Sequence, residues 1–260
     1  MLRSDSGHWY DREGTPCYTQ ITASGKNKGK ERNTTLRDAR KFGLLPSTTG
    51  IIKVADKPAL NRWIQQQLLE TAVTLPRLPN ETAAGFYTRI KDKQAKEGAC
   101  RMQLGTDIHD ALEQGFHNLP IPKEKEVYYH KVINCLHENL PGEKWVSEDS
   151  FGSELGYGGK VDLHSPNWVI DFKTKEFTPD SDPAKFVYDD HLMQLLSYGH
   201  GLKLEDGFNT GNIFISTHPD HVGYCAFVAH DPEHYERAWS MFKHLLGYWK
   251  LLNNYNSGWE

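Results

Sequence analysis

The sequence lacks the cysteine pattern of a disulfide framework or of a cysteine-based zinc site. Its four cysteines, Cys17, Cys100, Cys135 and Cys225, are scattered, and none forms a CxxC pair. Isolated thiols are typical of proteins in a reducing compartment. We therefore expect reduced cysteines and a cytoplasmic protein.

Long apolar runs are also missing. No stretch of about eighteen or more apolar residues occurs, so the sequence predicts no membrane-spanning helix and no membrane partner. The segment from Met1 to Ser6 has no apolar core, which argues against a signal or transit peptide. Hydrophobic residues at 38% and charged residues at 25% are instead ordinary for a soluble protein with a buried core.

A large excess of positive charge is the third absence. The net charge is only −4, which excludes a polycation that coats nucleic acid. Charge is uneven, however, because the stretch from Lys26 to Lys41 holds seven basic residues against two acidic ones. Gly25 and Gly29 in and beside it favour a solvated loop, and the alternative is an arm that contacts phosphate groups. The candidate DNA-binding residues here are Lys26, Lys28, Lys30 and Arg32.

Two stretches with strand character are the most informative part of the chain. Gly158–His164 and Trp168–Thr174 flank the turn-forming tripeptide Ser165-Pro166-Asn167, which predicts a β-hairpin. Gly156 and the glycines that open the first stretch precede a strand rather than a helix, so they are not a dinucleotide-binding fingerprint. We expect them to permit a tight turn and a close approach of the backbone to a ligand.

The hairpin brings charged side chains together. Period-2 alternation places Asp171 and Lys173 on one face of the second strand, opposite Ile170 and Phe172. Asp162 on the partner strand reaches the same face if the register allows. Two carboxylates with an ammonium group beside them indicate a divalent-metal site with a catalytic lysine.

Helical patterns surround this hairpin. Apolar spacing predicts helices over 58–68, 81–96, 103–117, 126–139, 188–201 and from Asp231 to about Asn253. His109 and Glu113 form an i, i+4 pair, and so do Gln194 and Tyr198. Either pair could be a plain helix-surface or partly buried contact. Their positions before and after the hairpin favour a functional role.

The predicted order after residue 100 is helix, helix, three meandering strands, helix, two strands and helix. Glu148 lies on the first of these strands, between Lys144 and Phe151. This order predicts an α/β fold with a mixed central sheet, preceded by a mostly helical region. We expect a division into an N-terminal lobe over 1–100 and a core over 101–260.

Two further histidine pairs have the spacing of metal ligands, His218 with His221 and His230 with His234. No cysteine pair completes a tetrahedral zinc site beside them. The second pair straddles a helix start, where a polar residue is unremarkable. We therefore assign no function to these histidines.

In this order, the motifs resemble those of PD-(D/E)XK nucleases, in particular the RecB-like branch that includes phage-type exonucleases. The resemblance covers roughly residues 100 to 230 and is carried by Gly105-xxx-His109-xxx-Glu113, Gly159-xx-Asp162, Asp171-Phe172-Lys173 and Gln194-xxx-Tyr198. Pro46-Ser47-Thr48-Thr49 and the segment from Lys57 to Trp63 are similar to the N-terminal region of phage-encoded members. The resemblance implies a restriction-endonuclease-like core.

The resemblance also implies roles for these residues. Asp162, Asp171 and the carbonyl group of Phe172 would hold Mg²⁺ or Mn²⁺, with His109 as a nitrogen ligand that favours Mn²⁺. Lys173 would position or deprotonate the attacking water. Gln194 and Tyr198 would orient Lys173 or the DNA strand, while Glu113 and Glu148 would support the ligands or hold a second metal. Members with an iron–sulfur cluster carry a C-terminal cysteine group, and since only Cys225 lies in that half we expect no cluster.

The function expected from the resemblance is a metal-dependent exonuclease that acts on DNA ends in phage or bacterial recombination, repair or replication. The N-terminal lobe, with Trp63 as a stacking residue, would guide a strand to the metal. A single-strand annealing or binding protein would be a partner. The alternatives are a structure-specific endonuclease on the same core and a non-catalytic DNA-binding member of a recombination complex.

Overall fold

The computed structural model describes residues 7–256 and 258. The stretch from Met1 to Ser6, which argued against a targeting segment, lies outside this part. Contacts divide the chain into two compact units. The core unit comprises Met1–Val54 and Ala111–Glu260, and the helical unit comprises Ala55–Asp110. The proposed functional division at residue 100 stays a prediction.

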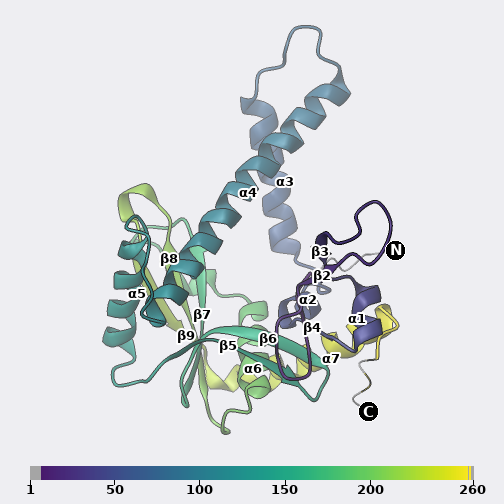
Figure 1. Cartoon of the computed structure of the whole chain (residues 1–260). Helices are drawn as coiled ribbons and strands as arrows, with labels where there is room; N and C mark the ends of the chain where they lie inside the picture. Colours follow the sequence, from purple (N-terminus) through teal and green to yellow (C-terminus); the bar gives the residue numbers. More distant parts are fainter. Residues whose placement is uncertain (1–6, 257, 259–260) are drawn as a thin grey trace. The chain divides into compact units, whose positions relative to one another are not determined.

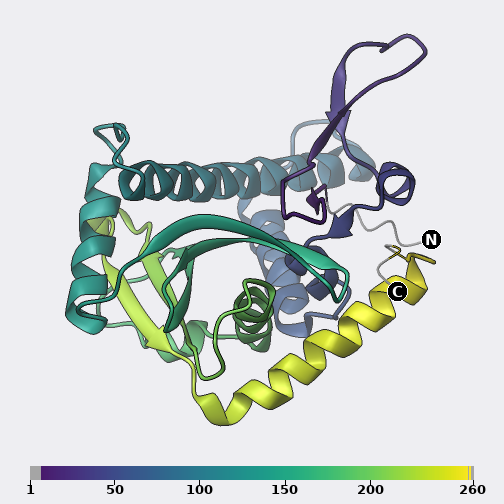
Figure 2. The ribbon, with the colours of Figure 1, turned by 60° about the horizontal axis from the view of Figure 1, so that its bottom comes forward.

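The core unit is built on a five-stranded sheet with the order β5-β6-β7-β8-β9 (Figures 1 and 2). The strands are β5 Val146–Ser153, β6 Tyr157–His164, β7 Trp168–Lys175, β8 Asn209–Ser216 and β9 Cys225–Ala229. Strands β5, β6 and β7 form an antiparallel meander, β8 is parallel to β7, and β9 is antiparallel to β8. The predicted α/β fold with a mixed sheet is confirmed, and it is consistent with a restriction-endonuclease-like core.

Helices flank this sheet. Helix α6 (Asp189–Gly201) contacts β5 to β8, α7 (Tyr235–Leu252) packs on α6, and α5 (Glu126–Asn139) contacts β8 and β9. Leu195 of α6 and Phe242 and Trp249 of α7 are fully buried in the largest apolar cluster. Burial of such side chains is the main favourable contribution to folding, at about 1.5–3 kcal/mol each. Three short 3-10 helices connect these elements: η1 Pro183–Phe186, η2 Pro219–His221 and η3 Pro232–His234.

The N-terminal segment of the core unit contributes small elements. They are β1 Trp9–Tyr10, β2 Thr19–Ile21, β3 Glu31–Asn33, α1 Leu36–Phe42, β4 Leu45–Pro46 and α2 Thr48–Ile52. Thr48, fully buried, donates to the carbonyl oxygen of Gly158 over 3.3 Å and accepts from Ser197 over 3.2 Å. The Pro46–Thr49 motif therefore attaches α2 to both β6 and α6, the two elements that flank the predicted site.

The helical unit contains α3 (Pro58–Thr74) and the first part of α4 (Ala83–Phe116). The sequence predicted two helices where α4 is continuous, and that prediction was wrong. Gly98 lies between the two predicted segments and remains helical. A single glycine costs a helix only about 1 kcal/mol relative to alanine, which the neighbouring turns can offset. No helix among the described residues is long and apolar enough to cross a membrane.

Candidate functional site

The Asp171 carboxylate is at the centre of the site. It lies on β7 and is only 3% exposed. Its Oδ2 accepts from Lys173 Nζ over 2.8 Å and from Asn212 Nδ2 over 2.9 Å, and its Oδ1 accepts from Gln194 Nε2 over 2.7 Å. A buried carboxylate is tolerated only when such donors replace the lost water. The predicted placement of Asp171 and Lys173 on one face of the strand is confirmed.

Gln194 connects the aspartate and the lysine from the side of α6. Its amide nitrogen donates to Asp171 and, over 3.0 Å, to the hydroxyl of Tyr198. Its Oε1 accepts from Lys173 Nζ over 3.2 Å. The i, i+4 spacing places Gln194 and Tyr198 on the same side of α6. Gln194 can thus hold both charged groups of the strand in one geometry.

Asp162 lies where the sheet ladder is interrupted. Pairing between β6 and β7 is recorded at Leu163–Ile170 and His164–Val169 and does not extend to Asp162. The Asp162 Oδ2 instead accepts from the backbone N–H of Phe172 over 2.8 Å. The carboxylate therefore accepts the hydrogen bond that the backbone of a neighbouring strand would otherwise accept. This contact holds Asp162 next to the Asp171–Lys173 segment. Phe172 itself stacks with Phe116 at the end of α4, with ring centroids 6.4 Å apart.

A second charged group adjoins the first. Lys160 on β6 forms an ion pair with Glu148 on β5, and its Nζ lies 3.5 Å from Glu113 Oε1. The β5–β6 ladder skips Glu148, whose φ of 59° falls in the left-handed region that is uncommon outside glycine. Backbone strain of this kind concentrates at functional sites. The sheet is therefore irregular on both sides of Asp162.

Burial and charge shift the pKa values of three groups here. Burial raises the pKa of Glu148 to about 7, with the nearby Asp162 adding to the shift and the ion pair to Lys160 opposing it. Burial alone would lower the pKa of Lys173, but the adjacent carboxylates, Asp171 above all, outweigh burial and raise it. The pKa of Tyr198 is raised well above its usual value by burial and by Asp171. Lys173 and Tyr198 are therefore both protonated at neutral pH.

The donor set fits a hard divalent cation. Asp162, Asp171, Glu148 and the Phe172 carbonyl group all offer oxygen, the donor that Mg²⁺ prefers and Mn²⁺ accepts. The Lys160 and Lys173 ammonium groups now balance the negative charge of the carboxylates. In the part of the chain that the structure describes, no three such acidic, histidine or cysteine side chains already surround one point. The types of donor atom therefore suit a divalent cation, although the side chains are not yet arranged around one point.

The other predicted site residues lie in several places. His109 is half-buried on α4 in the helical unit, four residues before Glu113. Trp63 on α3 is 48% exposed, and the Arg101 guanidinium lies 5.9 Å from its ring centroid. The metal-binding role of His109 and the DNA-binding role of Trp63 stay predictions.

The first half of the basic stretch lies in the β2–β3 hairpin (Figure 2), and its second half lies in α1. Lys26, Lys28 and Lys30 are exposed in the connecting loop of the hairpin. Arg32 on β3 has its guanidinium paired with both oxygens of Asp38, over 2.6 and 2.8 Å. This ion pair and the Asp38 capping interaction at α1 fix the base of the hairpin, so the three lysines are the better candidates for phosphate contact.

The glycines of β6 leave space for aromatic side chains that pack against the strand. A Cβ atom on Gly158 would lie 2.8 Å from Tyr10, and one on Gly159 would lie 2.8 Å from the Tyr198 ring. Gly156, with a φ of 88°, makes the predicted tight turn between β5 and β6. The close approach expected for a ligand is thus made by tyrosine side chains.

Sequence reasoning missed three residues of the site, Lys160, Asn212 and His230. An available signal was Asn212, an amide directly before the apolar run Ile213-Phe214-Ile215 of a predicted strand. Its partner His230 was set aside because a polar residue at a helix start is ordinary. The structure places His230 against Asn212, with Nε2 2.9 Å from Oδ1.

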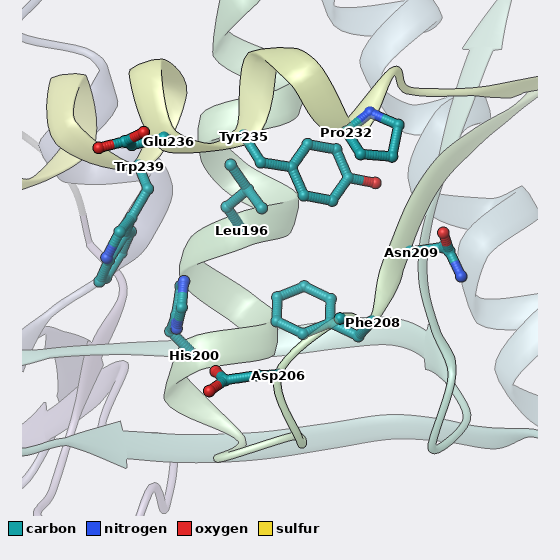
Figure 3. A pocket seen from close by; sticks show the side chains of 10 residues that line it. Leu196, His200, Asp206, Phe208, Asn209, Pro232, Tyr235, Glu236 and Trp239 are labelled. Carbon is teal, nitrogen blue, oxygen red and sulfur yellow. The ribbon is translucent and has the colours of Figure 1, made fainter.

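A pocket of about 330 Å³ lies elsewhere in the core unit (Figure 3). Its lining includes Leu196 and His200 of α6, Phe208, and Tyr235 and Trp239 of α7. The two α6 residues are offset by two positions from Gln194 and Tyr198, which places them on the opposite side of the helix. None of the predicted site residues lines this pocket, so it is separate from the charged site.

Comparison with known proteins gives matches among solved structures alone. No protein family and no curated protein matches the chain. An alkaline exonuclease from Laribacter hongkongensis is 13% identical, with 50% of this chain and 68% of that chain covered and a TM-score of 0.35. The protein SSO0001 is 15% identical, with 72% and 86% covered and a TM-score of 0.28. At these TM-scores neither match indicates a function for this chain.

Proposed function

We propose that this protein is a metal-dependent DNA exonuclease. The observation that carries the proposal is the Asp171 carboxylate, buried on a sheet strand and held by Lys173, Gln194 and Asn212 beside Asp162. A structural ion pair would not need a second carboxylate at an interruption of the ladder. The arrangement fits the order of motifs that the sequence shares with RecB-like nucleases.

The chain's own residues would divide the work of phosphodiester hydrolysis. Asp162, Asp171 and the Phe172 carbonyl group would hold Mg²⁺ or Mn²⁺, which polarises the phosphate and lowers the pKa of bound water. Lys173, protonated beside Asp171, would neutralise charge that develops on the phosphoryl oxygens. Gln194, which bonds to both side chains, would hold Lys173 and Asp171 in a fixed relative position.

His109, Glu113 and Glu148 are proposed as additional ligands or as support for a second metal. Glu148 has the strongest case because burial and neighbouring carboxylates make its ionisation unfavourable, which a cation would offset. Lys160 now supplies that positive charge to Glu113 and Glu148. His109 would add an imidazole, which Mn²⁺ accepts more readily than Mg²⁺.

The lysines of the β2–β3 loop would contact the phosphate backbone, and Trp63 would stack on bases. Tyr18, which precedes β2, shares a hydrogen bond of 2.8 Å with Tyr10, and Tyr10 packs against Gly158 of β6. The hairpin therefore begins close to β6, the strand that carries Lys160 and Asp162. A strand held by the loop would be led toward the carboxylates, which suits an enzyme that works from free ends.

A digestion panel tests the proposal. End-labelled linear single-stranded DNA, linear duplex and covalently closed circles are incubated with Mg²⁺, with Mn²⁺ or with a chelator. We expect loss of linear DNA with metal, no loss of circles and no loss with chelator. Cleavage of circles would instead identify an endonuclease. Chelator-insensitive DNA binding without any cleavage would identify a non-catalytic binding protein, for example one that acts with a strand-annealing partner in phage or bacterial recombination.

A further inference from the structure

Asn212 is an amide placed where an apolar residue would be expected. It lies in β8 in register with Asp171 of β7, and it is fully buried. Its neighbours along the strand, Gly211 and Ile213, are buried as well. An amide in such a position destabilises the fold unless its hydrogen-bonding groups are satisfied. Its contacts therefore indicate why it is there.

The hydrogen bonds of Asn212 fix the orientation of its amide group. The Nδ2 atom donates to the carbonyl oxygen of Asp171 over 3.2 Å and to its Oδ2 over 2.9 Å. Both partners are acceptors, so the NH₂ group must face Asp171 and Oδ1 must face away. On that far side Oδ1 meets Nε2 of His230 at 2.9 Å. His230 must therefore carry a proton on Nε2.

His230 is held in place for this contact. It follows β9 directly, and its backbone N–H continues the ladder by donating to Thr210 over 2.9 Å. Residues 210 and 212 share one face of β8, which brings the His230 ring diagonally opposite Asn212. The residue is 9% exposed, and burial lowers the pKa of His230 to about 4. The imidazole is thus neutral near pH 7, the state in which a single ring N–H is available.

We propose that His230 is a positioning residue of the active site. Through Asn212, which donates to the same Oδ2 atom that Lys173 contacts, it fixes the plane of the Asp171 carboxylate. The inference rests on the proposed nuclease function and extends it across the sheet to the end of β9. Outer groups that orient a ligand in this way typically affect metal affinity or activity about 10- to 100-fold.

The experiment compares His230→Met, which fills similar space and cannot donate, with His230→Gln, whose amide can donate to Asn212. Ser216→Ala is the matched control. Ser216 lies in β8, is as buried as Asn212, and donates to the Phe177 carbonyl group rather than to Asp171. For each protein kcat and KM on linear single-stranded DNA, the Kd for Mn²⁺ by calorimetry without DNA, and the urea unfolding midpoint are measured.

We expect His230→Met to lower kcat about 10- to 100-fold and to weaken Mn²⁺ binding about 10-fold, with KM for DNA within about twofold. His230→Gln should recover most of both losses, and Ser216→Ala should keep both values. A folded His230→Met with unchanged kcat and Mn²⁺ affinity contradicts the proposal, as does an equal loss in Ser216→Ala. If His230→Met does not fold, a folded His230→Gln decides: near-normal kcat supports positioning, and a 10-fold loss contradicts it.

Failure of the proposed function gives a different result. In that case the unaltered protein cleaves no DNA with any metal, whatever the variants do. Mn²⁺ binding by the unaltered protein and by the His230 variants then still tests the positioning inference, because calorimetry needs no substrate.

Discussion

The side-chain amide nitrogen of Gln194 lies 2.7 Å from Oδ1 of Asp171, and both side chains are buried. This contact joins α6 to β7 at the centre of the charged site. Because the other end of the same amide accepts from Lys173, one side chain on a helix sets the relative position of two groups on a strand.

Removal of this amide should impair catalysis more than removal of the neighbouring hydroxyl. Gln194→Leu loses the bonds to Asp171 and Lys173, and we expect kcat to fall about 10- to 100-fold. Tyr198→Phe removes a hydroxyl that contacts Gln194, so its kcat should stay within about fivefold of the unaltered protein. The measurement is steady-state digestion of linear DNA. A larger loss in Tyr198→Phe would show that the hydroxyl acts directly.

Lys173 should contribute charge rather than proton abstraction. Lys173→Met removes the ammonium group, and we expect kcat to fall about 10²- to 10³-fold, as for loss of a group that stabilises transition-state charge. Lys173→Arg keeps the charge and should recover part of the rate. If Lys173 were the general base, Lys173→Arg would be as inactive as Lys173→Met.

His230 should make stability depend on pH. Burial lowers its pKa from 6.5 to about 4, so the unfolded chain takes up a proton first as the pH falls. The contribution of His230 to the free energy of unfolding should therefore decrease by up to about 3 kcal/mol between about pH 6.5 and about pH 4, and its titration should have no effect above that range. Urea unfolding of the unaltered protein and of His230→Gln at several pH values isolates the contribution of His230. A difference between the two that does not change with pH would contradict the burial argument.

The loop lysines should affect DNA affinity and leave the chemistry intact. With Lys26, Lys28 and Lys30 all replaced by glutamine, we expect a higher KM for DNA and an unchanged kcat at saturation. The slope of log affinity against log salt should become shallower by about 0.7 for each lost contact to single-stranded DNA. Lys203→Gln is a matched control, because Lys203 is exposed and pairs with Glu154. Equal salt slopes in all proteins would exclude a phosphate-contacting role for the loop.

The hairpin and its flanking helices could be predicted because they depend on local patterns. Alternation along a strand places Asp171 and Lys173 together, and i, i+4 spacing does the same for Gln194 and Tyr198. Turn residues at Ser165 to Asn167 define where the strands meet. These rules need no knowledge of the remainder of the chain.

The other half of the site depends on strand register and long-range packing. Asn212 reaches Asp171 only because β8 is parallel to β7 and in register with it, which no local pattern specifies. His230 contributes through the antiparallel β8–β9 pairing, and Lys160 through the approach of Glu113 and Glu148. The single long α4 was also missed, because the apolar spacing was assessed separately over 81–96 and 103–117 and the helix continues between them.

The most direct test is metal-dependent cleavage by the unaltered protein, Asp171→Asn and Ser216→Ala in parallel. Each is incubated with end-labelled linear single-stranded DNA in Mn²⁺, and again with excess chelator. We predict cleavage by the unaltered protein and by Ser216→Ala in Mn²⁺, none with chelator, and a rate at least about 10²-fold lower for Asp171→Asn. Cleavage by Asp171→Asn at the rate of the unaltered protein, or cleavage that persists in chelator, would contradict the account.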